Sequence, residues 1–140
     1  ALTSRRGRKW LGLKSNDGEW RAGRRGGQRY AGPVVVLTSP RSGSGAELLA
    51  SALQEQGRAT ILGERTCGCL LGINRYEPLA GGGEIAISEV GLRSGRYGRR
   101  VEGEGVVPDI ALSPTRAAVA AGVDEARRAA VAHLRRVPPE

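Results

Sequence analysis

The spacing of apolar and polar residues predicts a strand, a helix and a second strand near the middle of the chain. Residues 33–38, PVVVLT, form a continuous apolar run, which is typical of a strand buried on both faces. From 45 to 56 the apolar residues recur at helical spacing, and Gly57 follows as a stop signal. Residues 58–63, RATILG, predict the second strand. Such a βαβ unit predicts that its two strands pair in parallel.

The flanking segments show weaker patterns. Residues 1–32 are polar and rich in Gly and Arg, and their few apolar residues predict at most one or two short strands. Residues 83–92, GEIAISEVGL, alternate as a half-exposed strand does. The segment 93–100 predicts a glycine turn, and residues 101–110 an extended stretch that Pro108 stops.

A helical pattern closes the chain. It runs from 115 to 136, with a break near Gly122 and a new N-cap at Asp124. The expected fold class is therefore mixed α/β, with a βαβ centre and an antiparallel flank. We divide the chain into an N-terminal segment of unclear structure, a core and a C-terminal helical segment, at residues 1–32, 33–113 and 114–140.

Composition narrows the function classes. The 140 residues suit one domain, and a net charge of +8 raises the possibility of a nucleic-acid partner. We disfavour that alternative, because the arginines are scattered and only five aromatic residues are present. No apolar run approaches the roughly 18 residues that span a bilayer. The chain opens with Ala1 and contains no Met, which indicates either a processed chain or, the interpretation we favour, a piece of a longer protein.

The metal-ligating residue types are few. Cys67 and Cys69 are separated by one residue, so a disulfide between them would close a strained ring, and we expect none. The single histidine, His133, is far away in the sequence. Two cysteines and one distant histidine make a poor metal site, so we expect neither metal nor cofactor.

The loop SPRSGSG, between the first strand and the helix, carries the candidate chemistry. It lacks the lysine of a phosphate-binding loop and the third glycine of a dinucleotide fingerprint. Ser44 and Glu47 have the spacing of a helix capping box. A serine there could also be a nucleophile, with the following Gly45 N–H and the helix dipole stabilising an oxyanion. From spacing alone, a plain N-cap is the stronger interpretation of Ser44.

Two segments resemble the C-terminal processing, or tail-specific, serine peptidases. They are PVVVLTSPRSGSGAELLASALQEQGRATILGERTCG and the later SGRYGRRVEGEGVVPDIAL, in the family's order. The resemblance implies the crotonase-like (Clp-protease-like) α/β spiral, protein or peptide substrates and no metal. It also implies an extracytoplasmic location in many bacteria. It makes Ser44 the nucleophile, Gly45 the backbone donor of half the oxyanion hole, and Ser42 a non-catalytic neighbour.

The general base is the difficulty in this resemblance. In the commonest branch a lysine activates the serine and a glutamine orients that lysine. Here those positions are Cys69 and Ile73, and neither Lys9 nor Lys14 lies in a matching motif. A cysteine is too short to replace the lysine. A Ser–Lys dyad is therefore excluded by residue identity.

A second branch, similar to tricorn and the interphotoreceptor-retinoid-binding modules, takes its base from a histidine far upstream. Its supporting acid lies in an E-x-x-G-V-x-P-D motif, which here places Glu102 in that role. The alternative for Glu102 is a solvated strand residue. The supporting role requires Glu102 within roughly 15 Å of Ser44, with Cys69 as a small packing residue. His133 follows the nucleophile and does not fit the base.

The sequence thus predicts the C-terminal part of a serine endopeptidase that forms an acyl-enzyme at Ser44. Its base is expected outside this chain. The alternative is a non-catalytic binding module on the same fold. The oligomeric state is not predicted.

Overall fold

The computed structural model describes residues 2–6, 17–20, 30–70, 72–93 and 101–137. Its centre is a parallel sheet of order β3-β4-β7, made of β3 (Val35–Thr38), β4 (Thr60–Gly63) and β7 (Ile110–Ala111). The helix α1 (Gly45–Glu55) connects β3 to β4. These strands pair in parallel from Val35↔Thr60 to Thr38↔Gly63. The predicted βαβ unit is therefore confirmed.

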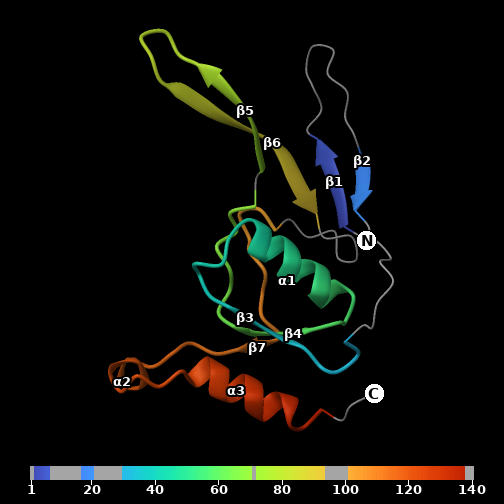
Figure 1. The fold of residues 1–140 in the computed structure, drawn as a ribbon, viewed down its shortest axis with the longest axis vertical. Helices are drawn as coiled ribbons and strands as arrows, with labels where there is room; N and C mark the ends of the chain where they lie inside the picture. The colour runs from blue at the N-terminus through green and yellow to red at the C-terminus, as the bar shows by residue number, and fades with distance from the viewer. Residues whose placement is uncertain (1, 7–16, 21–29, 71, 94–100, 138–140) are drawn as a thin grey trace.

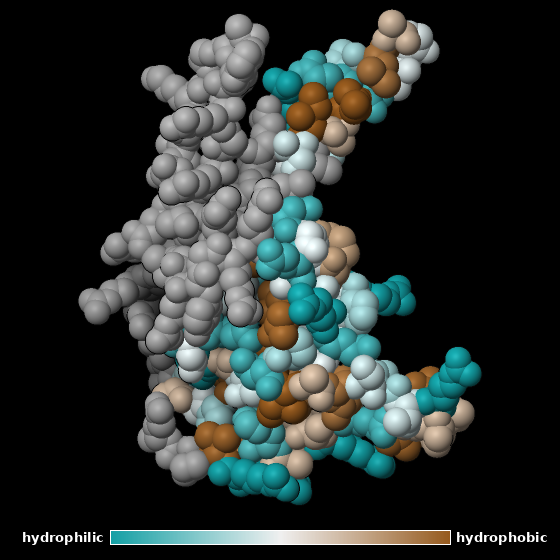
Figure 2. Space-filling model, turned by 180° about the vertical axis from the view of Figure 1, so that it is seen from behind, coloured by the Kyte–Doolittle hydropathy of each residue, from teal (hydrophilic) through white to brown (hydrophobic). Residues whose placement is uncertain are grey.

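A second, antiparallel sheet has the order β2-β1-β6-β5. Its strands are β1 (Leu2–Arg6), β2 (Asp17–Trp20), β5 (Gly72–Pro78) and β6 (Glu84–Arg93). The β5–β6 hairpin projects away from the helices (Figure 1). Leu79 and Ile85 are exposed on it, and Figure 2 shows hydrophobic side chains gathered along this arm. The antiparallel flank was predicted, but β5 was missed.

Two helices follow the parallel sheet. α2 (Arg116–Ala120) is capped by Thr115, whose side chain accepts the Ala118 N–H, and α3 (Glu125–Leu134) is capped in the same way by Asp124. The chain turns between them at Gly122, with φ +66°. α3 packs against β3 and β4, so the parallel sheet lies between α1 and α3 (Figure 1).

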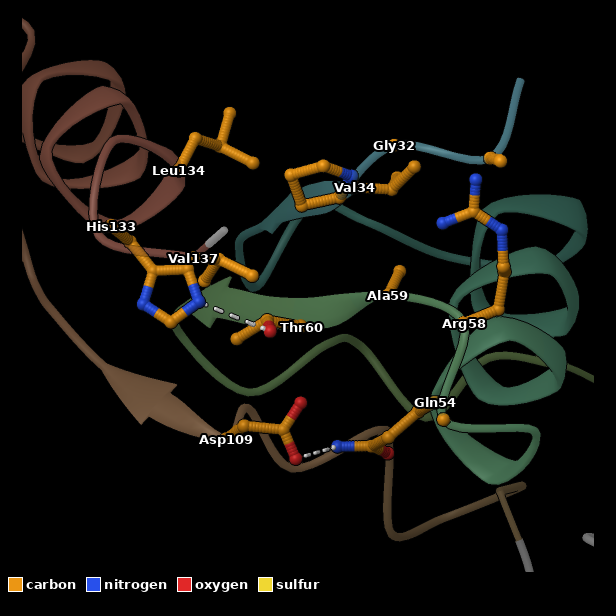
Figure 3. Close-up of a pocket in the computed structure, with 13 residues that line it drawn as sticks. Gly32, Val34, Gln54, Arg58, Ala59, Thr60, Asp109, His133, Leu134 and Val137 are labelled. Carbon is orange, nitrogen blue, oxygen red and sulfur yellow. Dashed lines mark hydrogen bonds between the residues drawn. The ribbon is translucent and has the colours of Figure 1, made fainter. Parts of the chain in front are cut away.

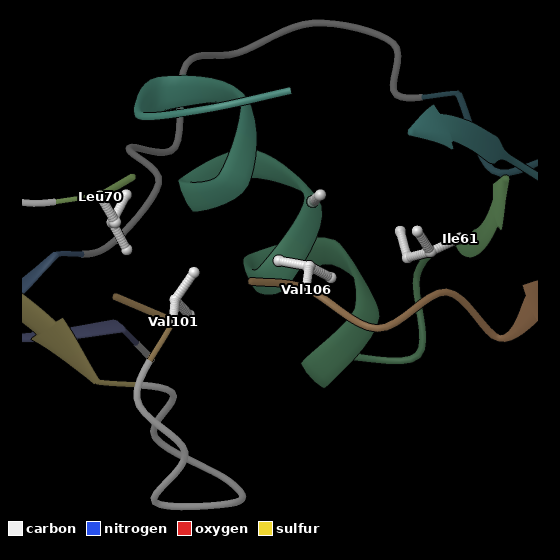
Figure 4. Close-up of a cluster of buried hydrophobic side chains, with 5 residues drawn as sticks. Ile61, Leu70, Val101 and Val106 are labelled. Carbon is white, nitrogen blue, oxygen red and sulfur yellow. The ribbon is translucent and has the colours of Figure 1, made fainter. Parts of the chain in front are cut away.

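The core is built from small aliphatic side chains, as a chain without Phe or Met requires. One cluster joins α1, β4 and the loops on either side of the β5–β6 hairpin, and Figure 4 shows it. Its buried members are Ala50, Ile61, Leu70, Val101 and Val106. Burial of such side chains contributes roughly 25 cal/mol per Å² of apolar surface. The cluster ties the loops at 70 and 101–106 to α1.

The extended stretch predicted for 101–110 is wrong. Residues 102–104 form a turn, and β7 begins only at Ile110. Gly103 and Gly105 have φ of +79° and +71°, and this left-handed backbone lets the chain reverse. Of the glycine turn expected at 93–100, Arg93 ends β6, and the other residues lie outside the described part of the chain.

Candidate active site

Ser44 lies at the end of the loop that leaves β3, as the N-cap of α1. The residue is exposed. Its backbone has φ 53° and ψ −121°, and it is the one non-glycine residue with positive φ in the described part of the chain. This conformation costs of order 1–3 kcal/mol for a residue with a Cβ. A strained turn between a strand and a helix is also how the α/β-hydrolases expose a serine nucleophile.

The predicted capping box between Ser44 and Glu47 is present. Glu47 Oε2 accepts the Ser44 N–H at 3.1 Å. The Glu47 N–H in turn donates to the Ser44 backbone carbonyl at 3.0 Å. The N-terminus of α1 is therefore capped through the Glu47 carboxylate together with Ser44.

The carboxylate of Glu47 does more than cap a helix. Glu47 is completely buried, at 0% exposure. Besides Ser44, it accepts the Thr66 hydroxyl and the Gly68 N–H on Oε1, at 2.5 and 2.6 Å, and the Cys69 N–H on Oε2 at 2.9 Å. Hydrogen bonds to a charged acceptor are the strong ones. Glu47 thus fixes the Ser44 loop to the loop that follows β4.

Gly45 is the first residue of α1, next to Ser44. The first N–H groups of a helix have no partner inside the helix. Within the described residues, the Gly45 N–H makes no loop or cap hydrogen bond. A Cβ at this position would meet no atom within 4 Å. The space over this amide is open, as an oxyanion donor requires.

The expectation that Cys67 and Cys69 form no disulfide is wrong. They form a disulfide, with their Cα atoms 5.2 Å apart. The residue between them, Gly68, has φ +74°. This left-handed conformation folds the chain back and brings the Cα atoms into the usual range of about 4.4 to 6.8 Å. Cys69 is exposed, not a packing residue.

Glu102 lies in the 102–104 turn and is half-buried, so it is not a solvated strand residue. Its Oε2 accepts the Leu70 N–H at 2.5 Å. The neighbouring Cys69 carbonyl accepts the Ser44 N–H at 2.9 Å. These steps place the Ser44 nitrogen and Glu102 Oε2 at most about 8 Å apart, since a peptide unit separates its O and N by about 2.2 Å. The supporting role of Glu102 stays a prediction.

His133 lies at the other end of the parallel sheet. Its Nε2 is 3.3 Å from the Thr60 hydroxyl, at the start of β4, whereas Ser44 follows the end of β3. It lines a cavity of about 550 Å³ together with Asp109 and Gln54 (Figure 3). The Asp109 carboxylate there accepts hydrogen bonds from Gln54 and from the backbone of β4. This arrangement keeps His133 away from Ser44.

The other basic candidates lie outside the part of the chain that the structure describes. Lys9 and Lys14 fall there, and so does the side chain of Ile73, whose backbone belongs to β5. Within the described ranges, no three His, Cys, Asp or Glu side chains gather to hold a metal ion. The same ranges contain no helix of the length and apolarity that crossing a membrane requires.

Comparison with known proteins identifies the class. Residues 4–112 match the model of Peptidase family S41, and the chain belongs to that family. Tricorn protease homolog 1 of Streptomyces coelicolor is 32% identical over 76% of this chain and 10% of its own length. A carboxyl-terminal-processing protease of Synechocystis is 35% identical over 55% of this chain and 18% of its own. The chain therefore spans between about a tenth and a fifth of these curated relatives.

Solved structures share the fold. A candidate peptidase from Parabacteroides merdae superposes with a TM-score of 0.71 at 24% identity, over 87% of this chain and 37% of that one. The tricorn protease superposes with a TM-score of 0.63 at 24% identity, over 74% of this chain and 10% of that one. These likenesses confirm the predicted fold class, in which a parallel sheet and an antiparallel sheet combine with helices.

Sequence reasoning missed two residues of the site. Thr66 is buried, donates to Glu47 and accepts the Val106 N–H at 2.7 Å. Glu47 was recognised only as a capping residue. The available signal was a charged residue on the inner face of a helix, because such a residue needs several polar partners when it is buried.

Proposed function

We propose that this chain carries the nucleophile of a serine peptidase and forms the acyl-enzyme at Ser44. The observation that supports this most is the Ser44 backbone. An exposed serine in a strained conformation at the N-terminus of α1 is more than a helix cap requires, because Thr115 and Asp124 cap α2 and α3 with an unstrained, extended backbone. Strain that persists at one residue is typical of functional sites.

In the proposed mechanism, Ser44 Oγ attacks the carbonyl carbon of a peptide bond. The new oxyanion accepts the Gly45 N–H, and the positive end of the α1 dipole stabilises it further. The serine proton passes to a general base and then to the leaving amine, so the C–N bond breaks as the ester forms. Water hydrolyses that ester by the reverse sequence of proton transfers.

The general base of this proposal comes from outside the described residues. Histidine is the expected type, held by a hydroxyl that Glu102 supports. Glu102 is suited to this role by its half-buried position beside the Leu70 amide. Proteins or peptides are the proposed substrates. Carboxyl-terminal processing, after which two relatives are named, is the proposed reaction class.

An activated ester tests the nucleophile in this chain. Even without a base, an oxyanion donor and binding keep part of the rate enhancement. We expect p-nitrophenyl acetate to acetylate Ser44 at least about tenfold faster than Ser42, as measured by peptide mass mapping. Ser42 is the matched control, since it lies in the same loop and its hydroxyl accepts the Ser39 N–H.

The Ser44→Ala variant should lose the labelled peptide and keep the fold. Equal acetylation of both serines would refute the nucleophile assignment and favour the alternative, a non-catalytic binding module. That alternative has one observation in its favour. Cys69, at the position of the lysine base in the commonest branch, is held in a disulfide.

A further inference from the structure

The Cys67–Cys69 disulfide is open to solvent beside the serine loop. Both cysteines are exposed, whereas Thr66, Gly68 and Leu70 between and around them are buried. Thiol–disulfide exchange requires a thiolate to reach one of the two sulfur atoms. The alternation of exposed and buried residues presents both cysteines to solvent and holds the backbone between them in place.

Two backbone hydrogen bonds couple this disulfide to the serine loop. The Cys67 N–H donates to the Ser42 carbonyl at 2.9 Å, and the Ser44 N–H donates to the Cys69 carbonyl at 2.9 Å. Gly43 lies between these two contacts. A Cβ at Gly43 would lie 3.6 Å from Cys67 Cβ and 3.7 Å from Cys69 Cβ. Any displacement of the two cysteines therefore acts directly on the Ser44 loop.

The other side of the disulfide loop is also tied down. The Gly68 and Cys69 amides donate to Glu47. The Gly68 carbonyl accepts the Gly103 N–H at 2.8 Å, next to Glu102. A Cβ at Gly68 would lie 3.0 Å from the Gly105 nitrogen, so the loop has no room to move toward that turn. Movement after bond cleavage is directed toward the solvent and the Ser44 loop.

From these contacts we propose that Cys67 and Cys69 form a redox-sensitive disulfide that holds the Ser44 loop in its strained conformation and releases it on reduction. The reductant is a dithiol. One of its thiolates attacks a cysteine sulfur, the Cys67–Cys69 bond breaks and a mixed disulfide forms. The second thiolate of the reductant resolves it. The protein gains two electrons and two protons as two thiols, and the reductant becomes a disulfide.

Reduction has a steric consequence for the loop. Once the bond is broken, the two sulfur atoms must move apart to van der Waals distance, roughly 3.5–4 Å for heavy atoms. Gly43 and the Ser44 amide lie directly beside them. The hydrogen bond from Ser44 to the Cys69 carbonyl is therefore weakened in the reduced protein. The effect on catalysis rests on the proposed function of Ser44, whereas the structural switch does not.

Amide hydrogen exchange tests the switch in this chain. The ¹⁵N-labelled protein is prepared oxidised, its disulfide is confirmed by a mass two hydrogens below the dithiol form, and half is reduced with dithiothreitol. We expect the Ser44 and Cys69 amides to exchange at least about tenfold faster after reduction. The Arg127 amide, which donates to Asp124 in α3, is the internal control and should not change.

Two variants separate reduction from other effects of the reagent. Cys67→Ser and Cys69→Ser each remove the disulfide. In both variants the Ser44 amide should therefore exchange at the rate seen in the reduced protein, and dithiothreitol should not change that rate. Absence of the disulfide in the air-oxidised chain, or unchanged Ser44 exchange after reduction, would overturn the proposal. If exchange responds but Ser44 is acetylated in neither state, the switch stands and the proposed peptidase function fails.

Discussion

Replacing Glu47 by glutamine exchanges one oxygen of a buried side chain for an NH₂ group. Each carboxylate oxygen accepts two hydrogen bonds, from Thr66 and Gly68 on Oε1 and from Ser44 and Cys69 on Oε2. A glutamine can accept on one side only. Whichever way it turns, its NH₂ group faces a buried donor. The Glu47→Gln variant should therefore be destabilised without any change of side-chain size.

The magnitude follows from the donors that lose an acceptor. With the NH₂ group toward Gly68, the Thr66 hydroxyl can rotate, but the Gly68 N–H is orphaned. With the NH₂ group toward Cys69, the Ser44 N–H still donates to the Cys69 carbonyl, but the Cys69 N–H has no acceptor. One unsatisfied buried donor costs about 1–3 kcal/mol, and the remaining bonds lose their charge-assisted strength. We expect a loss of about 2–4 kcal/mol in the free energy of unfolding.

Urea denaturation followed by circular dichroism measures this loss, with an unchanged m-value as evidence for the same two states. Glu84→Gln, at an exposed position of β6, is the matched control and should stay within about 0.5 kcal/mol of the parent. A double-mutant cycle with Thr66→Val should give a coupling of about 0.5–3 kcal/mol. If Glu47→Gln is no more destabilising than Glu84→Gln, the role assigned to the buried carboxylate is wrong.

Four further predictions address the loops around the site. Ser44→Gly should be about 1 kcal/mol more stable to urea than Ser44→Ala, because glycine adopts φ 53° without strain; equal stabilities would show that the backbone is unstrained. Gly105→Ala should lower the melting temperature by several degrees in calorimetry, since its Cβ would overlap the Thr66 carbonyl oxygen; an unchanged melting temperature would contradict that packing. The chain by itself should not hydrolyse an unstructured peptide above the Ser44→Ala background in a fluorescence assay, and serine-dependent turnover would show that a base is present. In a longer form of the protein with measurable turnover, Glu102→Ala should lower kcat by about tenfold or more, whereas an unchanged kcat would contradict the histidine-type assignment.

The sequence predicts the parts of the site that are local in the chain. Ser44 and Glu47 are three residues apart, and their spacing alone indicates the N-terminus of α1. The remaining partners of Glu47 come from residues 66–69, about twenty positions later. No periodicity links them to the helix, because their approach depends on how β4 pairs with β3.

The errors in the sequence analysis come from glycines whose backbone conformation is set by tertiary contacts. Gly68 has a positive φ that brings Cys67 and Cys69 together, and Gly103 and Gly105 reverse the chain after Glu102. A glycine in a sequence shows that a turn is permitted there. It does not show that the turn forms, and the extended stretch predicted for 101–110 was an equally permitted alternative.

The pairing of β1 with β6 sets the order in which the protein can fold during synthesis. Thr3 lies opposite Arg93, and Arg6 opposite Val90, so β1 leaves the ribosome long before its partner strand is made. The pairing of β3 with β4 is complete by Gly63, although the core of this unit also uses Val101 and Val106, which follow β6. A two-stranded hairpin such as β1–β2 is at best marginally stable alone. A nascent chain paused before β6 would therefore leave β1 and one edge of β4 without their partner strands β6 and β7.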